Sequence, residues 1–297
     1  MKNSTLQICC FGELLWDVYA PDQKRLGGAP YNVAYRLNSY GAQAQLITAI
    51  GKDELGVQAQ QIVEEAGLSD ALIQNNSKNT GTVDVLLDAS KKASYTINTN
   101  VAWDFIKATP KALEAVTNAD AFVFGSLALR QTHNQKTFEA LIEQASYKVF
   151  DLNLREPHYD LAVVITLMEI ADFIKLNDEE LELITTLMDI TKDSLEEEIK
   201  ALATLTQSQT VCVTLGADGA MLYHKGKIYT QRAFNIDLVD TVGAGDSFLA
   251  TLLFGLLSNE TPEDSLALGC CIGALVASKT GANPILSQEE INQMMGW

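Results

Sequence analysis

The chain has little positive charge, few histidines and no long apolar run, and each of these absences argues against a class of function. Its 297 residues contain 21 Lys and Arg against 38 Asp and Glu, so the formal net charge is −17. A chain this acidic is repelled by nucleic-acid phosphates and by anionic lipid surfaces, so we expect neither nucleic acid nor a membrane among its partners. The apolar runs at residues 248–257 and 266–277 are also shorter than the roughly 20 residues of a membrane span.

Cysteine is present, but not in a disulfide pattern. The five cysteines are odd in number and lack framework spacing, which indicates reduced thiols and a cytoplasmic location. No secretory signal is visible, because the first apolar run is short and carries Glu13 and Asp17. Cys9 and Cys10 would point to opposite faces of a strand, so this pair is interpreted as packing rather than as a metal chelate. The three histidines show no metal-ligand spacing.

What remains is the composition of an α/β protein with a large core. With 47% hydrophobic residues, the chain can bury such a core, and no linker, repeat or low-complexity segment divides it. We therefore expect residues 1–297 to form a single domain. The sequence has no Gly-x-x-x-x-Gly-Lys-Ser/Thr element, so a P-loop nucleotide site is not supported.

One glycine-rich turn lies between an expected strand and an expected helix. Residues 240–247 read Asp-Thr-Val-Gly-Ala-Gly-Asp-Ser, follow a strand-like run and precede leucines at helical spacing. The first N–H groups of a helix lack intrahelical partners and lie at the positive end of its dipole. They can stabilise phosphate oxygens, and glycines let the backbone approach closely. The expected anion-binding residues are Gly243, Ala244, Gly245 and Asp246.

Asp246 is the candidate catalytic base. A carboxylate with an unperturbed pKa of about 4 is ionised at neutral pH and can accept the proton of an attacking hydroxyl. Taken alone, the turn is equally consistent with an ordinary connection between a strand and a helix.

A second glycine-rich segment lies near the N-terminus. Residues 27–32 read Gly-Gly-Ala-Pro-Tyr-Asn before a helical run, and residues 12–17 read Gly-Glu-Leu-Leu-Trp-Asp at the end of an expected strand. With the turn at residues 240–247, these segments resemble the two signatures of the PfkB/ribokinase-like sugar kinases, and residues 12–17 resemble the fructokinase branch. The resemblance covers nearly the whole chain.

The resemblance implies a ribokinase-like three-layer α/β sandwich with a mostly parallel central sheet and a small β-sheet lid. The residue patterns agree, because strand and helix candidates alternate along the chain. Strands are expected at residues 6–11, 44–51, 121–127, 147–152, 172–176 and 210–215, and at the hairpin 220–223 and 227–230. Helices are expected at residues 53–66, 111–118 and 134–145. A further helix should begin at Thr261-Pro262 and stop at Gly281.

The expected lid combines residues 82–98 with residues 18–26. Residues 82–88 and 94–98 alternate with period two around a polar turn at 89–92, which is typical of a hairpin. By closing over a sugar, such a lid would exclude water from a transferring phosphoryl group. An ordinary edge hairpin is the alternative. Val83, Val85 and Leu87 share one face of the hairpin, so a homodimer in which two lids cover each other is also expected.

Sugar contacts are expected at the carboxyl edge of the sheet, where ligands bind in open α/β folds. The resemblance assigns Asp17, Gly28 and Asn32 to this role. Arg155, in Asp151-x-Asn153-x-Arg155, is the candidate clamp on a substrate or phosphate oxygen, because a guanidinium makes forked, permanently charged contacts. The alternatives are a solvated loop position for Asp17 and a surface ion pair of Arg155 with a neighbouring carboxylate, Glu156 or Asp160.

Asn177-x-x-Glu180 matches the family motif linked to Mg²⁺ and phosphate. Mg²⁺ prefers oxygen ligands and keeps several waters, so these two side chains need only hold its hydration shell. The competing interpretation is helix capping, with Asn177 as the N-cap and Glu180 at the third helical position. Both can hold at once.

The resemblance also implies a nucleotide loop after the strand at residues 210–215. Thr214, Gly216 and Gly219 would line the phosphates and adenosine of ATP. Asn283 lies in a later loop that, in the family, flanks adenine and a site for a monovalent cation such as K⁺.

The sequence therefore predicts an ATP- and Mg²⁺-dependent sugar kinase, with fructose giving fructose 6-phosphate as the leading reaction. The nearest rival is a 2-keto-3-deoxygluconate kinase. A different class is also open, namely a non-catalytic sugar-binding regulatory protein derived from a kinase.

Overall fold

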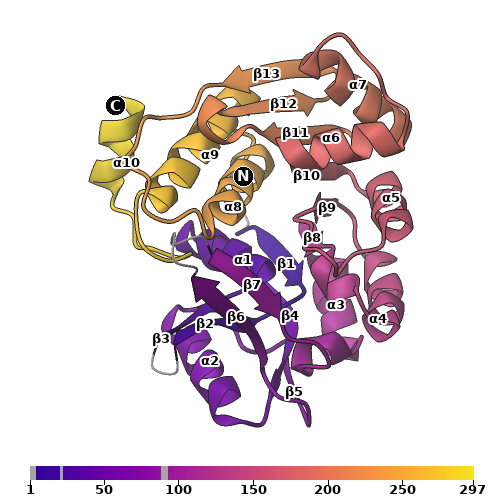
Figure 1. Cartoon of the computed structure of the whole chain (residues 1–297), viewed down its shortest axis with the longest axis vertical. Helices are drawn as coiled ribbons and strands as arrows, with labels where there is room; N and C mark the ends of the chain where they lie inside the picture. The colour runs from indigo at the N-terminus through magenta and orange to yellow at the C-terminus, as the bar shows by residue number, and fades with distance from the viewer. Residues whose placement is uncertain (1–4, 21–22, 88–92) are drawn as a thin grey trace.

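The computed structural model describes residues 5–20, 23–87 and 93–297, and two β-sheets organise them (Figure 1). The larger sheet has nine strands in the order β13-β12-β11-β10-β9-β8-β1-β4-β5. The strands from β11 to β5 in this order are parallel, and β12 and β13 add an antiparallel hairpin at one edge. Their bounds are β1 (Gln7–Phe11), β4 (Gln43–Gly51), β5 (Ile73–Asn76), β8 (Ala121–Gly125), β9 (Lys148–Asp151), β10 (Phe173–Asn177), β11 (Thr210–Thr214), β12 (Ala220–His224) and β13 (Lys227–Gln231).

Helices cover both faces of this sheet, which gives the predicted three layers (Figure 1). One face carries α3 (Pro110–Asn118), α4 (Thr132–Ile142), α5 (Leu161–Ile170), α6 (Asp178–Leu187) and α7 (Leu195–Thr206). The other carries α1 (Ala29–Ser39), α2 (Glu54–Glu65), α8 (Ala244–Leu257) and α9 (Pro262–Ala277), and α10 (Gln288–Met295) packs on α9. Within the described ranges, none of the helices has the length and apolarity needed to cross a bilayer.

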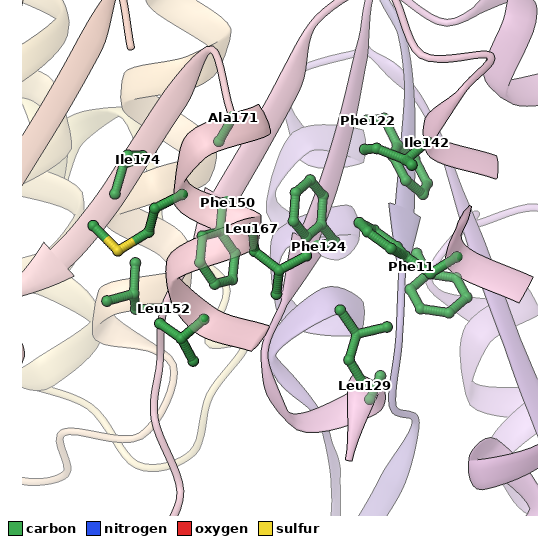
Figure 2. Packing of buried hydrophobic residues seen from close by; sticks show 14 of the residues in the cluster. Phe11, Phe122, Phe124, Leu129, Ile142, Phe150, Leu152, Leu167, Ala171 and Ile174 are labelled. Carbon is green, nitrogen blue, oxygen red and sulfur yellow. The ribbon is translucent and has the colours of Figure 1, made fainter. Parts of the chain in front are cut away.

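The alternation of side chains along the strands separates two cores. Cys9 of β1 lies in the cluster under α3 to α7, and Cys10 lies in the cluster under α1 and α8, so the two thiols point to opposite faces as expected. All five cysteines are buried and free. In the first cluster the rings of Phe124 and Phe150, from adjacent strands, stack with centroids 5.2 Å apart (Figure 2). Burying each such ring contributes roughly 1.5–3 kcal/mol, and this core fixes the strand ends that carry the site.

A separate four-stranded sheet is formed by the segments expected in the lid. Its order is β3-β2-β6-β7, with bounds β2 (Leu15–Ala20), β3 (Gln23–Gly27), β6 (Gly81–Leu87) and β7 (Ala93–Ile97). The predicted hairpin is therefore confirmed, although its turn at residues 89–92 and the side chain of Leu87 lie outside the described part. Val83 and Val85 are 5% and 2% exposed and pack with Leu15 within the one chain.

Two local predictions were wrong and one strand is shorter than expected, and backbone hydrogen bonds accompany these differences. The strand expected at residues 121–127 ends at Gly125, and Leu127–Leu129 forms a 3-10 helix, because Leu129 N–H donates to Ser126 O at 3.0 Å. The helix that begins after Thr261 ends at Ala277, four residues before Gly281. The strand-like run before residue 240 is not a strand, because Val239 and Asp240 donate to Ala277 O at 2.9 and 3.1 Å instead. The other predicted boundaries lie within three residues of the observed ones.

Candidate active site

Polar side chains gather where β1, β9 and β10 end at the carboxyl edge of the large sheet. A narrow cavity at this edge is lined by Glu13, Ser126, Asp151 and Asn153, among others. The parallel pairing of β1 with β8, β8 with β9 and β9 with β10 brings these strand ends together, although they are far apart in the chain.

The glycine-rich turn opens α8 next to this edge. Gly243 is the residue before the helix and has a left-handed φ of 78°, and a Cβ there would meet Ala282 O at 2.5 Å. Only glycine fits this position without moving the backbone. The N–H of Ala244 donates to Thr241 O at 3.2 Å. Those of Gly243, Gly245 and Asp246 donate to no other group in the described part of the chain.

Asp246 stands in the first turn of α8, and α1 supports it. Asn32 Nδ2 donates to Asp246 Oδ2 at 2.7 Å. Burial raises the pKa of Asp246 to about 6, and the nearby Asp151 carboxylate also raises it, whereas Asn32, Lys175 and Arg155 lower it. The sequence predicted an ordinary carboxyl with a pKa of about 4, so the observed environment makes Asp246 a stronger base while leaving it mostly ionised at neutral pH.

Lys175 is a site residue that the sequence reasoning missed. It lies in β10, opposite Asp151 of β9, and its Nζ lies 2.9 Å from Asp151 Oδ1 with both side chains less than one-tenth exposed. A Cβ at Gly245 would lie 3.4 Å from the same Nζ, so the ammonium sits beside the glycine turn. The available signal was a lysine between two apolar residues, Ile174 and Leu176, of a strand, since a buried charge needs a partner.

Glu13 and Gly28 form the entry to α1. The backbone of Gly28 has a φ of 115°, and a Cβ there would meet Glu13 O at 2.4 Å, so this position requires glycine. Glu13 Oε1 accepts from the N–H of Ala29 at 3.1 Å. Burial raises the pKa of Glu13 to about 7. Sequence reasoning had not assigned Glu13 a role.

Asp17 lies on the smaller sheet. It belongs to β2 and pairs across the strands with Arg25 of β3, rather than lying in a loop at the edge of the large sheet. Burial raises the pKa of Asp17 to about 6, with a further rise from Asp240, whereas Arg25 and Arg155 lower it. A second strand sheltering Asp17 argues against a solvated loop carboxylate.

Arg155 is exposed and forms no ion pair with Glu156 or Asp160. Its Nη1 donates to Leu154 O at 2.9 Å. Its charge lowers the pKa values of Asp17 and Asp246, so it acts on both ends of the site. The guanidinium is thus available to a ligand.

Asn177 and Glu180 form the capping box that was the competing interpretation. Asn177 Oδ1 accepts from Glu180 N–H at 2.7 Å, and Glu180 Oε2 accepts from Asn177 N–H at 2.9 Å. Glu180 Oε1 also accepts from Leu154 N–H at 2.7 Å, which ties α6 to the segment before Arg155. Within residues 5–20, 23–87 and 93–297, no group of three or more His, Cys, Asp or Glu could ligate a metal directly.

The residues predicted for the nucleotide lie in two places. Thr214 ends β11, and Gly216 and Gly219 have positive φ values of 53° and 107° in the turn that follows. A Cβ at Gly219 would meet Gln231 O at 2.0 Å, so the absence of a side chain here also lets the end of β13 pack against this turn. Asn283 lies instead against α1, where its Nδ2 donates to Asn32 Oδ1 at 2.7 Å.

The chain is similar to known carbohydrate kinases along nearly its whole length. The model of the pfkB family carbohydrate kinases matches residues 6–289. Fructokinase-2 of Solanum habrochaites is 29% identical, with 96% of this chain and 94% of the relative covered. A double mutant of fructokinase from Vibrio cholerae O395, bound to fructose, ADP and potassium, has a TM-score of 0.83 at 24% identity over 99% of each chain. The 2-dehydro-3-deoxygluconokinase of Thermotoga maritima has a TM-score of 0.87 at 21% identity, covering 98% of this chain and 100% of that one.

The fold and the site thus define a sugar phosphotransferase with a ribokinase-like architecture. The chain belongs to the pfkB family of carbohydrate kinases.

Proposed function

We propose that this protein transfers the γ-phosphoryl group of ATP to fructose and releases fructose 6-phosphate and ADP. The observation that carries the proposal is the Asp246 carboxylate, held by Asn32 beside free N–H groups in the first turn of α8. Fructose as the acceptor is supported by the curated relatives, which are fructokinases at 26–30% identity, and by the Vibrio cholerae structure that holds fructose and ADP.

Asp246 is the general base in this proposal. It accepts the proton of the attacking sugar hydroxyl as the oxygen–phosphorus bond forms and the bond to the β-phosphate oxygen breaks. The N–H groups of Gly243, Gly245 and Asp246 stabilise the charge on the transferring phosphoryl group, and Ala244 can join them if its bond to Thr241 opens. Because phosphoryl transfer passes through a loose transition state, positioning and charge stabilisation contribute more than base strength.

The remaining predicted residues keep their roles as proposals. Asp17, Gly28, Asn32 and Arg155 would contact the sugar. Thr214, Gly216 and Gly219 would contact ATP, and the smaller sheet would close over the sugar as a lid. We propose that the whole chain works as one kinase unit in the cytoplasm, which the five free, buried thiols support.

The side chains at the sheet edge fit Mg²⁺. Asp151 Oδ2 is a buried carboxylate oxygen with no hydrogen-bond partner among the described residues, and Asn177 and Glu180 lie at the end of the neighbouring strand. Both Glu180 oxygens already accept from backbone N–H groups, which suits contact through water rather than direct ligation. When bound, Mg²⁺ would neutralise charge on the phosphate oxygens.

The described residues offer no equally clear site for a monovalent cation such as K⁺. Asp240 contacts the loop of Asn283 through the N–H of Gly281, but its oxygens also accept from Arg25 and from the N–H of Val242. We therefore derive no step through this ion, although the Vibrio cholerae fructokinase holds potassium.

A 2-keto-3-deoxygluconate kinase is the second candidate, and the guanidinium of Arg155, which pairs with no carboxylate among the described residues, favours it. An exposed arginine without a carboxylate partner can bind the carboxylate of a sugar acid. The Thermotoga maritima relative in fold acts on such a substrate. Asp17, by contrast, would repel a carboxylate placed beside it and suits neutral sugar hydroxyls.

A panel of sugars in a coupled assay of ADP release, with ATP and Mg²⁺ and with and without K⁺, tests the proposal. We expect the highest kcat/KM for fructose. A higher kcat/KM for 2-keto-3-deoxygluconate would replace fructose with the rival substrate. Calorimetric binding of sugar and ATP without any ADP release would instead indicate a non-catalytic regulatory protein.

A further inference from the structure

A short loop near the C-terminus touches the catalytic turn and α1 with four consecutive residues. Gly281 N–H donates to Asp240 Oδ2 at 3.1 Å, and the backbone of Ala282 packs against Gly243. Asn283 Nδ2 donates to Asn32 Oδ1 at 2.7 Å, and Pro284 O accepts from Arg36 Nη2 at 3.1 Å. The loop therefore connects the anion-binding turn to the helix that supports the base.

The α1 side of this contact repeats with helical spacing. Asn32 and Arg36 lie four residues apart on one face of α1. Asn32 bonds to Asp246 and Asn283. Arg36 bonds to the residues that follow these two in the chain, because its Nε donates to Ser247 Oγ at 3.3 Å and its Nη2 donates to Pro284 O. Arg36 is 3% exposed and forms no ion pair with any described carboxylate, so its buried charge is held by these neutral partners.

The charge of Asp246 sets the direction of the hydrogen bonds. An ionised carboxylate only accepts, so Asn32 must present its NH₂ group to Asp246 and its carbonyl oxygen to Asn283. Asn283 must then donate. Asn283 Oδ1 is buried without a partner in the described part of the chain, so this side chain acts on the protein through its bond to Asn32.

We propose that Asn283 is a positioning residue for phosphoryl transfer. By donating to Asn32 Oδ1, it fixes the amide of Asn32 in the one orientation that directs an N–H group to the Asp246 carboxylate. The inference rests on the proposed function and differs from the nucleotide contact that the family resemblance implied for Asn283.

Aspartate and leucine are near-isosteric replacements that separate the possible roles. In Asn283→Asp the new carboxylate accepts instead of donating, so Asn32 has to divide its NH₂ group between two carboxylates. The protonated form of the new side chain can still donate to Asn32 Oδ1. Asn283→Leu removes the donor without adding charge. Asn259→Asp is the matched control, because it adds the same charge beyond the far end of α8, roughly 20 Å from the base.

Steady-state kinetics with fructose and ATP across pH test the proposal. For Asn283→Asp we expect kcat to fall roughly 10- to 100-fold at alkaline pH, as for other outer-shell partners, with KM for ATP unchanged. The ratio of variant to wild-type kcat should recover toward low pH as the new carboxyl is protonated. The other charged groups around Asp246 and the loop are present in both proteins, so their effect on the pH dependence largely cancels in this ratio. Near Asp246 they are Glu13, Asp151, Arg155 and Lys175. Near the loop they are Arg36, Asp240 and the Lys279–Glu290 pair.

A second readout needs no turnover. The carboxyl titration of Asp246, followed by NMR, should shift to higher pH in Asn283→Leu, where no donor to Asn32 is present at any pH, and should stay in place in Asn259→Asp, because the Asn32 bond lowers the pKa of Asp246. An unshifted Asp246 titration overturns the inference, and this readout does not depend on activity. If the chain phosphorylates no sugar, that result overturns the proposed function instead. A rise in KM for ATP with kcat unchanged assigns Asn283 to the nucleotide. An equal, pH-independent loss in both variants with a lowered Tm assigns it to folding alone.

Discussion

Lys175 Nζ lies 2.9 Å from Asp151 Oδ1 on the adjacent strand, at the centre of a site that is otherwise rich in carboxylates. Asp151, Glu180 and Asp246 all interact with this ammonium, which keeps its own pKa raised despite burial. Removing one partner of such a buried pair typically costs about 3–5 kcal/mol. The Lys175 ammonium therefore offsets part of the negative charge of these carboxylates, which would otherwise oppose the binding of a nucleotide phosphate.

Replacing the base should abolish turnover without abolishing binding. In Asp246→Asn the side chain keeps its size but loses its proton affinity, so we expect kcat to fall by about 10²–10⁴-fold. Calorimetry should show sugar and ATP affinities close to those of the wild type. Near wild-type turnover in this variant would remove Asp246 from its assigned role.

The pH dependence of kcat/KM should show an acidic limb near the pKa of Asp246, which burial raises to about 6. The base works only when ionised, so activity should be full above this value and fall about tenfold per pH unit below it. The pKa values of Asp17 and Glu13, about 6 and 7, lie close to that of Asp246, so the group that causes the acidic limb has to be identified.

Two charge changes next to Asp246 provide that assignment. Asp151 raises the pKa of Asp246 and Lys175 lowers it, but neither appears among the groups that shift Asp17 or Glu13. The limb should therefore move to lower pH in Asp151→Asn and to higher pH in Lys175→Met. Thermal unfolding of both variants provides the control for folding. A limb that stays in place in two folded variants would belong to another group.

Sugar selectivity should divide between Asp17 and Arg155. Asp17→Ala leaves sugar hydroxyls without an acceptor, at about 1–3 kcal/mol for each unpaired group, so fructose kcat/KM should fall strongly while ATP affinity is retained. Arg155→Ala is the matched test of the rival. If the wild type prefers 2-keto-3-deoxygluconate and Arg155→Ala abolishes that preference, the fructose assignment is incorrect.

The homodimer through the lids remains a prediction, and the structure changes its basis. Val83 and Val85 are already buried within one chain, so a dimer would have to gain its stability from other parts of the smaller sheet. Light scattering at micromolar concentration should show a dimer if the lids pair. A fully active monomer at that concentration would rule the assembly out.

Local patterns predicted most of the secondary structure, because capping and alternation act within a few residues. The Asn177–Glu180 capping box, the Thr261 N-cap and the hairpin at residues 82–98 were visible in the chain and occur as expected. The errors arose where distant groups intervened. The run before residue 240 has the apolar character of a strand, but its N–H groups bond to the end of α9.

The sequence by itself determined the family through its contiguous motifs, and it determined the alternation of strands and helices and the position of Asp246 at the start of a helix through periodicity. The layered fold was what the family resemblance implied. Tertiary structure alone decided what surrounds that carboxylate. Asn32 and Asn283 are 214 and 251 residues from their partners Asp246 and Asn32, and Lys175 meets Asp151 only through strand pairing. The pKa of Asp246 depends on burial and on these distant charges, so it is a property of the packed protein rather than of the motif.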